Sequence, residues 1–175
     1  ALVTGPTTGI GREFAQQLAT QGFNVVLVGI IMADLKATAA ELEKLGVKTR
    51  IVEANFSGNA TPAFYMGIVG EVMDLDIGLI ILNAGVQKPG RLHATPLKDL
   101  QLFIDVNSYH PGALLSQFLP RLKQRKSRSG ALLVSSMGSR LVFPISCTYS
   151  ATKVFVQYLC RAVGHELAQD PTNKV

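Results

Sequence analysis

Short apolar runs alternate with helical patterns along this chain of 175 residues, and this alternation restricts the fold more than any other feature. Strand-like runs are "ALVTG", "NVVLVG", "VKTRIVEAN", "IGLIILNAG" and "SGALLVSS". Helical patterns follow each of them, over "GREFAQQLATQG", "ADLKATAAELEKLG", residues 62–75, residues 96–125 and "YSATKVFVQYLCRAVGHELAQD". Strands that alternate with helices form parallel sheets through right-handed crossovers, with helices on both faces. The sequence therefore predicts an α/β fold, a doubly wound parallel sheet in three α/β/α layers.

The alternation continues without a linker, a repeat or a low-complexity segment, so residues 1–175 are expected to form a single domain. The first residue already lies inside a predicted strand, and the last residues, "PTNKV", stop where another strand is expected. We therefore expect the domain to be truncated at both ends and to lack its last strands in this chain.

Composition excludes several classes of protein. Apolar residues make up 47% and charged residues 17%, which excludes a disordered chain, and no apolar run reaches the roughly 18 residues of a membrane span. Cys147 and Cys160 have neither a disulfide pattern nor metal-ligand spacing, and we expect buried or half-buried free thiols. His93, His110 and His165 are scattered, so no metal site is predicted.

Much of the formal net charge of +5 comes from the segment "RLKQRKSRSG". A basic cluster could bind nucleic acid or anionic lipid. This one closes a predicted helix, where cations complement exposed carbonyl groups, and no aromatic residues are interspersed with it. We interpret it as a solvated helix end and expect no nucleic-acid partner.

The segment "TGPTTGIG" lies between the first predicted strand and the first helix. Its glycines, Gly5, Gly9 and Gly11, permit a sharp turn, a close approach of backbone to a phosphate, and tight packing of helix against sheet. A pyrophosphate at that point would meet the free amides and the positive dipole end of the helix. The spacing is G-x-x-x-G-x-G rather than G-x-G-x-x-G, and it predicts a dinucleotide-binding loop.

Four motifs in a fixed order resemble the short-chain dehydrogenase/reductase family, whose domain is a Rossmann fold. They are Thr4-Gly5-x-x-x-Gly9-Ile10-Gly11, Asn83-Ala84-Gly85, Ser136 and Tyr149-x-x-x-Lys153, with Ser136 lying 13 residues before the tyrosine. Within the family, "YSATKVFVQYL" and "DIGLIILNAG" look like the very-long-chain 3-oxoacyl-CoA reductases and 17-beta-hydroxysteroid dehydrogenases. The resemblance covers almost the whole chain.

The resemblance implies the catalytic residues Asn107, Ser136, Tyr149 and Lys153. A ketone reductase must protonate a developing alkoxide, and a phenol serves this purpose near neutral pH only when its anion is favoured. Lys153 follows Tyr149 by one helical turn and brings a positive charge within reach of it. By resemblance, Tyr149 is the general acid, Lys153 also binds the nicotinamide ribose, and Ser136 holds the substrate carbonyl.

Asn107 in "FIDVNSYHPG" matches the family's fourth catalytic residue, whose backbone carbonyl holds a water that relays protons towards the lysine. The sequence adds a physical reason. Pro111, four residues later, has no amide hydrogen, so the carbonyl of Asn107 loses its helical partner. Either Pro111 only kinks the helix, or the kink and a freed, water-binding carbonyl are linked, which is the hypothesis we take forward.

The cofactor residues that the resemblance implies are Gly5, Thr7, Thr8, Gly9, Ile10, Gly11, Asn55, Asn83, Ala84, Gly85, Tyr149 and Lys153. Three positions depart from the family's pattern. The second strand ends in Gly29-Ile30-Ile31, which offers neither the Asp that binds an NAD ribose nor the Arg that binds the NADP phosphate. Asn55 replaces an Asp that accepts from adenine, and Leu82 replaces an Asn. The related branch favours NADP(H), which we prefer over NAD(H).

Two hypotheses for the function follow from the sequence. The first is an NAD(P)-dependent oxidoreductase that interconverts a ketone and a secondary alcohol on a lipid-like small molecule, either a 3-oxoacyl-CoA or a steroid. The second is a dinucleotide-binding protein that has lost turnover and acts as a sensor or interaction partner. We also expect a homo-oligomer formed through the helices that carry Asn107 and Tyr149. The expected location is intracellular, in the cytoplasm or at the endoplasmic reticulum membrane, with any membrane contact made by segments outside this chain.

Overall fold

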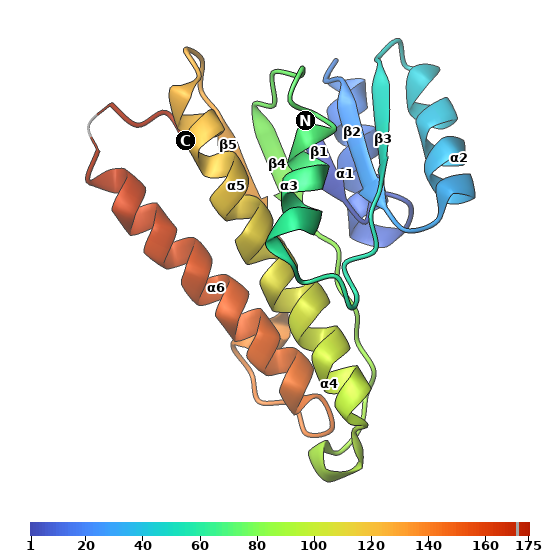
Figure 1. Cartoon of the computed structure of the whole chain (residues 1–175), viewed down its shortest axis with the longest axis vertical. Helices are drawn as coiled ribbons and strands as arrows, with labels where there is room; N and C mark the ends of the chain where they lie inside the picture. Colours follow the sequence, from blue (N-terminus) through green and yellow to red (C-terminus); the bar gives the residue numbers. More distant parts are fainter. Residues whose placement is uncertain (171) are drawn as a thin grey trace.

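The computed structural model describes residues 1–170 and 172–175 and contains one parallel sheet flanked by helices (Figure 1). The strands are β1 (Leu2–Thr4), β2 (Val25–Gly29), β3 (Thr49–Glu53), β4 (Leu79–Leu82) and β5 (Gly130–Leu133). The α-helices are α1 (Gly9–Thr20), α2 (Met32–Glu43), α3 (Pro62–Gly70), α4 (Leu97–Ile104), α5 (His110–Gln124) and α6 (Cys147–Ala168). A π-helical segment (Asp105–Tyr109) joins α4 to α5, and short 3-10 helices cover Leu92–Ala94 and Met137–Ser139.

The strand order is β3-β2-β1-β4-β5, and every neighbouring pair is parallel. The order reverses between β1 and β4, so the chain winds in one direction from β1 to β3 and in the other from β4 to β5. Ligands of such sheets bind outside the carboxyl ends of the strands at this reversal point. The predicted doubly wound fold is confirmed, and the topology itself indicates where a ligand would bind.

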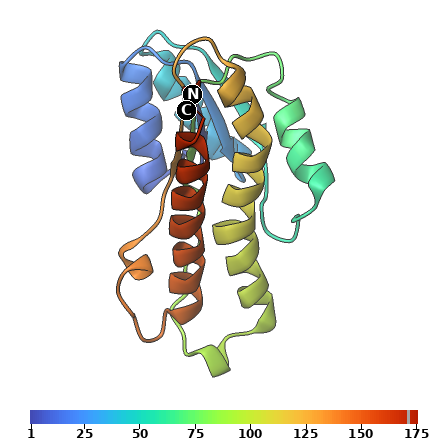
Figure 2. The ribbon, with the colours of Figure 1, turned by 90° about the vertical axis from the view of Figure 1, so that its left-hand side faces the viewer.

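Each face of the sheet has its own hydrophobic core. One core joins α1 and α2 to the sheet through residues such as Ala15, Leu18 and Leu35. The other packs α3, α5 and α6 on the opposite face, around Phe56, Tyr65 and Phe118, which are all buried. Figure 2 shows α1 and α3 on opposite sides of the sheet, with α5 and α6 side by side. The three predicted layers are therefore present.

The long helix that runs from Leu97 to Gln124 is continuous but not uniform. The predicted helical stretch over residues 96–125 forms α4, the π-helical segment and α5 in succession. Within it the amide of His110 donates to the carbonyl of Asp105, five residues earlier, instead of four. Pro111 follows directly and has no amide to donate, so the wider turn lies where the α-helical ladder would lose a bond.

Two predicted helix boundaries differ from the structure. The third helix ends at Gly70, not at residue 75, because the residues after it form tight turns in which Met73 N donates to Gly70 O and Leu75 N to Val72 O. The last helix begins two residues earlier than the "YSATK" pattern suggests, because Ser146 precedes its first turn and accepts from the amide of Ser150.

The prediction of buried or half-buried thiols is wrong. Cys147 and Cys160 are both free and exposed. Cys147 opens α6 beside the surface loop that precedes it, and Cys160 borders the groove between α6 and the end of β5. The sequence alone does not show which face of an amphipathic helix a small apolar side chain occupies.

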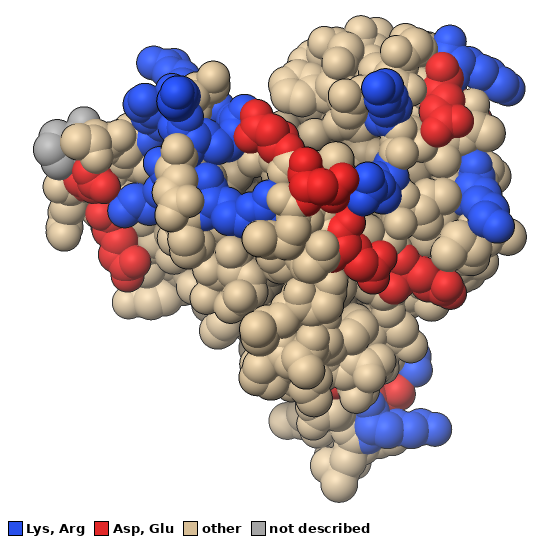
Figure 3. Space-filling view, turned by 45° about the horizontal axis from the view of Figure 1, so that its top comes forward, with Lys and Arg blue, Asp and Glu red and all other residues tan. Residues whose placement is uncertain are grey.

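Part of the basic cluster at the end of α5 contacts the neighbouring loops, while Lys126 and Arg128 are exposed to solvent, as expected. Arg121 donates to the carbonyls of Met73 and Leu75, and Lys123 pairs with Asp170 at 3.2 Å. Figure 3 shows blue and red side chains next to each other in this upper part of the molecule. These cations do complement carbonyl groups, as expected, but the carbonyls belong to the loop after α3.

Candidate active site

A cleft of about 520 Å³ lies at the carboxyl-terminal edge of the sheet, where the strand order reverses. The loops after β1, β2, β3 and β4 line it on one side, and the end of β5 with the first turns of α6 lines it on the other. The predicted site residues that line it are Gly5, Thr7, Thr8, Ile10, Asn55, Asn83, Ala84, Gly85, Tyr149 and Lys153. Segments up to 148 positions apart in the sequence thus meet in one cleft.

The glycine loop forms the turn that its sequence predicts. Gly5 and Gly9 both have positive φ, at 64° and 53°, a conformation that favours glycine. A Cβ on Gly11 would lie 2.1 Å from the carbonyl oxygen of Gly5, so only glycine allows α1 to pack this closely on the loop. The first turn of α1 has no acidic residue and its N-cap, Thr8, makes no side-chain cap. This helix terminus leaves its amides and dipole available to an anion, which fits the pyrophosphate of a dinucleotide.

The end of β4 is tied to the glycine loop by Thr4 and Asn83. The Thr4 hydroxyl accepts from the amides of Asn83 and Ala84, each at 3.0 Å, and the Asn83 side chain donates to the carbonyls of Thr4 and Gly5. These bonds connect positions about 80 residues apart and hold the floor of the cleft. Leu82, which replaces an Asn of the family's pattern, is buried in the core.

Asn107 is almost fully buried in the π-helical segment and uses its side chain to hold the loop after β4. Its amide nitrogen donates to the carbonyl of Val86 and its amide oxygen accepts from the amide of Val86, both at 2.8 Å. A Cβ on Gly85 would lie 3.3 Å from both the Asn107 oxygen and the Lys153 ammonium. Asn107, Gly85 and Lys153 therefore meet at one point beside the cleft.

Tyr149 and Lys153 lie on one face of α6 and both line the cleft. The Lys153 ammonium lies 5.8 Å from the centre of the Tyr149 ring and donates to the carbonyl of Val134 at 3.0 Å. Burial lowers the pKa of Lys153, because desolvation disfavours its charged form. Among the described residues it forms no ion pair, so two of its three donors stay available for a ligand.

Ser136 lies one residue beyond the cleft wall. Ser135 lines the cleft and donates to the carbonyl of Lys153, whereas Ser136 borders an adjacent groove together with Arg140 and Arg161. The Ser136 hydroxyl accepts from the amide of Gly138 at 3.2 Å and so caps the short 3-10 helix after β5. The structure therefore brings Tyr149 and Lys153 together in the cleft and Ser136 to its edge, while Gly9, Gly11 and Asn107 support it from outside.

The cleft wall at the end of β2 is apolar. Ile30 and Ile31 line it and are 56% and 58% exposed, with no charged side chain among the cleft residues near them. Asn55, after β3, lines it as well, but its amide oxygen already accepts from the amide of Ser57 at 3.0 Å. A contact to adenine through the same oxygen would have to use its second lone pair.

Several cleft residues were not predicted from the sequence. They are Phe56, Ser57, Val86, Gln87, Leu102, Val106, Val134 and Ser135. Most are apolar or small, and they follow a strand end next to a predicted site residue, except that Leu102 lies on α4 and Val106 in the π-helical segment. Asp105 is not predicted from the sequence, and His110 is considered there only as a scattered histidine outside any metal site, although both polar residues flank Asn107 and are buried.

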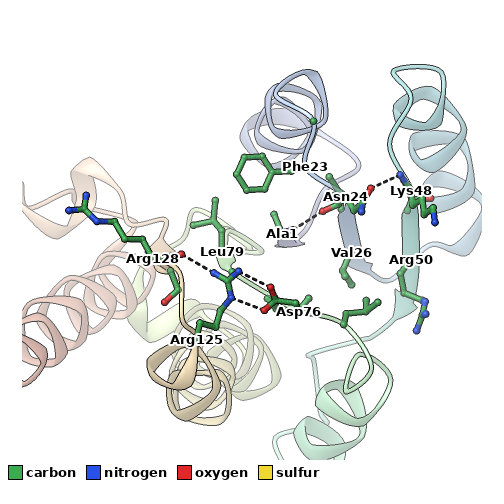
Figure 4. Close-up of a pocket in the computed structure, with 18 residues that line it drawn as sticks. Ala1, Phe23, Asn24, Val26, Lys48, Arg50, Asp76, Leu79, Arg125 and Arg128 are labelled. Carbon is green, nitrogen blue, oxygen red and sulfur yellow. Dashed lines mark hydrogen bonds and ion pairs between the residues drawn. The ribbon is translucent and has the colours of Figure 1, made fainter. Parts of the chain in front are cut away.

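A second cavity, of about 750 Å³, lies at the opposite, amino-terminal edge of the sheet (Figure 4). Arg125 spans it and binds Asp76 through two nitrogens, at 2.7 and 2.8 Å, and donates to the carbonyl of Arg128. This ion pair lowers the pKa of Asp76, first through its hydrogen bonds to Arg125. Arg125 and Asp76 are thus paired with each other, while Lys48, Arg50 and Arg128 also line this cavity.

The fold and the cleft together define a dinucleotide-binding domain with a tyrosine–lysine pair at its edge. The family profile described as short chain dehydrogenase matches residues 1–173, and the chain belongs to this family. It is 36% identical over 173 residues to the very-long-chain 3-oxoacyl-CoA reductase of Laccaria bicolor, a match that covers 97% of this chain and 51% of that protein. The chain spans about half the length of the curated relatives it matches.

Solved structures agree with this family. A 7beta-hydroxysteroid dehydrogenase matches with a TM-score of 0.85 at 28% identity, over 94% of this chain and 64% of that one. An alcohol dehydrogenase from Thermococcus sibiricus, complexed with 5-hydroxy-NADP, matches with a TM-score of 0.86 at 25% identity, over 94% and 69%. Among the described residues, no helix combines the length and the apolar character needed to cross a membrane.

Proposed function

We propose that this domain is the cofactor-binding and catalytic part of an NAD(P)-dependent oxidoreductase that interconverts a ketone and a secondary alcohol. The observation that carries the proposal is the cleft itself, in which Tyr149 and Lys153 face the glycine loop across the reversal point of the sheet. A bound nicotinamide dinucleotide supplies the hydride in such chemistry. The remaining roles belong to residues of this chain.

In the reduction, the Tyr149 hydroxyl donates its proton to the substrate oxygen as the carbonyl carbon becomes tetrahedral. The charge of Lys153, 5.8 Å from the tyrosine ring, favours the phenolate that remains. Ser136 holds the substrate oxygen with its hydroxyl, which requires that hydroxyl to turn from the amide of Gly138 into the cleft. Reprotonation of Tyr149 completes the cycle.

Asn107 provides the route for that proton in this proposal. Its side chain is fully engaged with Val86, so its backbone carbonyl is the group left for a water. Pro111 cannot donate to this carbonyl, and the π-helical segment widens the helix at the same point. The Asn107 side chain and the Lys153 ammonium both approach Gly85, so the segment that carries this carbonyl lies beside Lys153.

The proposed cofactor is NADP(H), with NAD(H) as the alternative. Support comes from the relatives named above, one of which was solved with an NADP derivative. The apolar rim of Ile30 and Ile31 offers no carboxylate to a ribose diol and no guanidinium to a phosphate. We therefore expect a weak preference between the two cofactors, because neither gains a charged partner at this position.

The proposed substrate is lipid-like, a 3-oxoacyl-CoA or a steroid. The loop between Ser136 and Tyr149 carries exposed apolar side chains at Leu141, Val142, Phe143 and Ile145, and Val142 is 96% exposed. Gly90 N donates to the carbonyl of Ile145, so the loop after β4 adjoins this apolar segment. An apolar surface beside the tyrosine suits a ketone with a long hydrocarbon part.

We further propose that the protein assembles as a homo-oligomer through α4, α5 and α6. Val154, Phe155 and Tyr158 are exposed on α6, and Phe155 borders a hollow next to Tyr109 and Gly112. Association of such apolar faces is the usual basis of symmetric dimers. The proposed location is the cytoplasm or the endoplasmic reticulum membrane.

The experiment is to measure consumption of NADPH and NADH by the full-length protein with a panel of 3-oxoacyl-CoA thioesters and ketosteroids. Turnover that vanishes in Tyr149→Phe supports the enzyme. The alternative, a dinucleotide-binding sensor without turnover, draws its support from the missing charge at Ile30 and Ile31. Cofactor binding with no turnover on any of these ketones would favour that alternative.

A further inference from the structure

The loop after β3 forms one wall of the cleft. Its backbone is bonded to the sheet through the amide of Ala54, which donates to the carbonyl of Gly29. Ala54, Asn55, Phe56 and Ser57 line the cleft. Local bonds give the loop its shape, since the Asn59 side chain donates to the carbonyl of Asn55 at 3.0 Å and the Asn55 side chain accepts from Ser57. Gly58 has a φ of 71°, which favours glycine at the apex.

One contact that ties this loop to the rest of the domain comes from Asp105 in the π-helical segment. Its carboxylate is almost fully buried and accepts from the amide of Gly58 at 3.0 Å and from the side chain of Gln101 at 2.6 Å. A buried carboxylate is costly unless it is well bonded, and a bond to a charged acceptor is stronger than one between neutral groups. The carboxylate at this position therefore fixes where Gly58 lies.

His110, at the other end of the same segment, holds the loop through Phe56. The two rings are stacked with centres 4.0 Å apart, and His110 is completely buried. Its Nδ1 lies 2.9 Å from the carbonyl of Val106, so Nδ1 carries the proton and donates to that oxygen. Its uncharged ring can then stack on Phe56 without a counter-charge.

Asn107 lies between these two residues and binds the opposite cleft wall at Val86. One π-helical segment thus fixes the loop after β3 with Asp105 and the loop after β4 with Asn107. We propose that Asp105 is a positioning residue for the dinucleotide, which keeps the loop of residues 55–58 in its binding conformation relative to Asn107 before the cofactor enters. The inference rests on the proposed function, because it assumes that a dinucleotide occupies this cleft.

A loop that is already ordered loses less conformational entropy when the ligand binds, so loss of the tether weakens affinity without touching the ligand. Asp105→Ala leaves the Gly58 amide without its partner. Asp105→Asn keeps an acceptor for Gly58, and Gln101 can turn its amide to accept from the new nitrogen. Gly58→Ala acts on the same contact from the loop side, because the left-handed φ disfavours a side chain although there is space for one.

The test measures NADPH affinity of the full-length protein by titration calorimetry. For Asp105→Ala we expect the dissociation constant to rise about tenfold, as for a lost bond to a charged group. KM for NADPH should rise in parallel while kcat at saturating NADPH stays unchanged. Gly58→Ala should weaken binding in the same direction, and Asp105→Asn should restore affinity to within about twofold of wild type.

The matched control is Leu122→Ala, a buried residue of α5 far from the cleft, which lowers stability without touching the loop. Hydrogen exchange of residues 55–58 should accelerate in Asp105→Ala and not in Leu122→Ala. Wild-type affinity in Asp105→Ala, or an equal loss of affinity in Leu122→Ala, would overturn the inference alone. Failure of the wild type to bind either NADPH or NADH would instead overturn the proposed function, and the inference with it.

Discussion

The cavity at the amino-terminal edge of the sheet measures about 750 Å³, whereas the cleft at the carboxyl-terminal edge measures about 520 Å³. In the larger cavity, Arg125 and Asp76 neutralise each other with two hydrogen bonds. In the smaller cleft, Lys153 has no ion-pair partner among the described residues, and the first turn of α1 carries no carboxylate. The glycine turns and the unblocked N-terminus of α1, and not volume, distinguish the candidate site from the larger cavity.

The topology explains this difference. In a parallel sheet all carboxyl ends lie at one edge, so the loops that follow the strands converge there, and glycine turns and helix N-termini converge with them. The amino ends of the strands receive the C-termini of helices and the return loops. There Arg121 and Arg125 bind carbonyl and carboxylate groups of the loop after α3, which closes α5 against the sheet.

The largest effect is expected on kcat, from the substitution Tyr149→Phe in the smaller cleft. Removal of the hydroxyl removes the proton donor, and we expect kcat to fall about 1,000-fold, within the range of general acid catalysis. The measurement is the rate of NADPH oxidation with the best ketone of the panel. Because the ring remains in place, the NADPH dissociation constant should stay within about threefold of wild type, a change of less than about 1 kcal/mol. A variant that keeps its rate would remove Tyr149 from the mechanism.

The second prediction concerns His110, behind the cleft wall. Burial lowers its pKa to about 4 from the ordinary value of 6.5. The unfolded chain therefore binds more protons between these values, and stability falls as the pH falls from 6.5 towards 4. The 2.5 pH units correspond to about 3 kcal/mol.

His110→Phe keeps a ring against Phe56 and removes this titration. Urea unfolding between pH 7 and pH 4 should then show a shallower loss of stability than in the wild type. Asp74, Asp76 and Asp170 also have lowered pKa values, and because their unfolded forms protonate at about pH 4, the stability they contribute is lost mainly below this window. Identical slopes for the variant and the wild type would show that folding does not lower the pKa of His110.

The smallest expected effect lies at the opposite edge. Arg125→Met removes the bidentate pair with Asp76 and should reduce the free energy of unfolding by about 1 kcal/mol, as expected of a partly exposed ion pair. The NADPH dissociation constant should not change. Asp76→Asn serves as the matched partner variant. Loss of NADPH affinity in both would mean that the larger cavity takes part in cofactor binding.

Much of the fold was readable from the sequence because local signals agree with the global topology. Gly22 and Gly46 end the first two helices with φ values of 85°, and Leu35, Ala39 and Leu42 form the buried stripe that their spacing predicts. The chain from Tyr149 to Lys153 needs only one helical turn to juxtapose its two functional groups. Patterns of this kind depend on neighbours in sequence, so no tertiary knowledge is required.

The remainder depends on contacts between distant segments. No local pattern shows that Asp105 meets Gly58, 47 positions away, or that Asn107 binds Val86. Likewise, the sequence places Ser136 next to Ser135 without showing which of the two lines the cleft. The exposure of Cys147 and Cys160 follows from what packs on α6, which helix periodicity alone does not specify.

The most direct test of the central claim is hydrogen exchange of the full-length protein with and without saturating NADPH. We expect added protection at residues 5–11, 54–58 and 83–87, which line or support the cleft at the carboxyl-terminal edge, and none around the larger cavity. Protection at residues 22–26, 76–79 and 125–130, with the glycine loop unchanged, would contradict it.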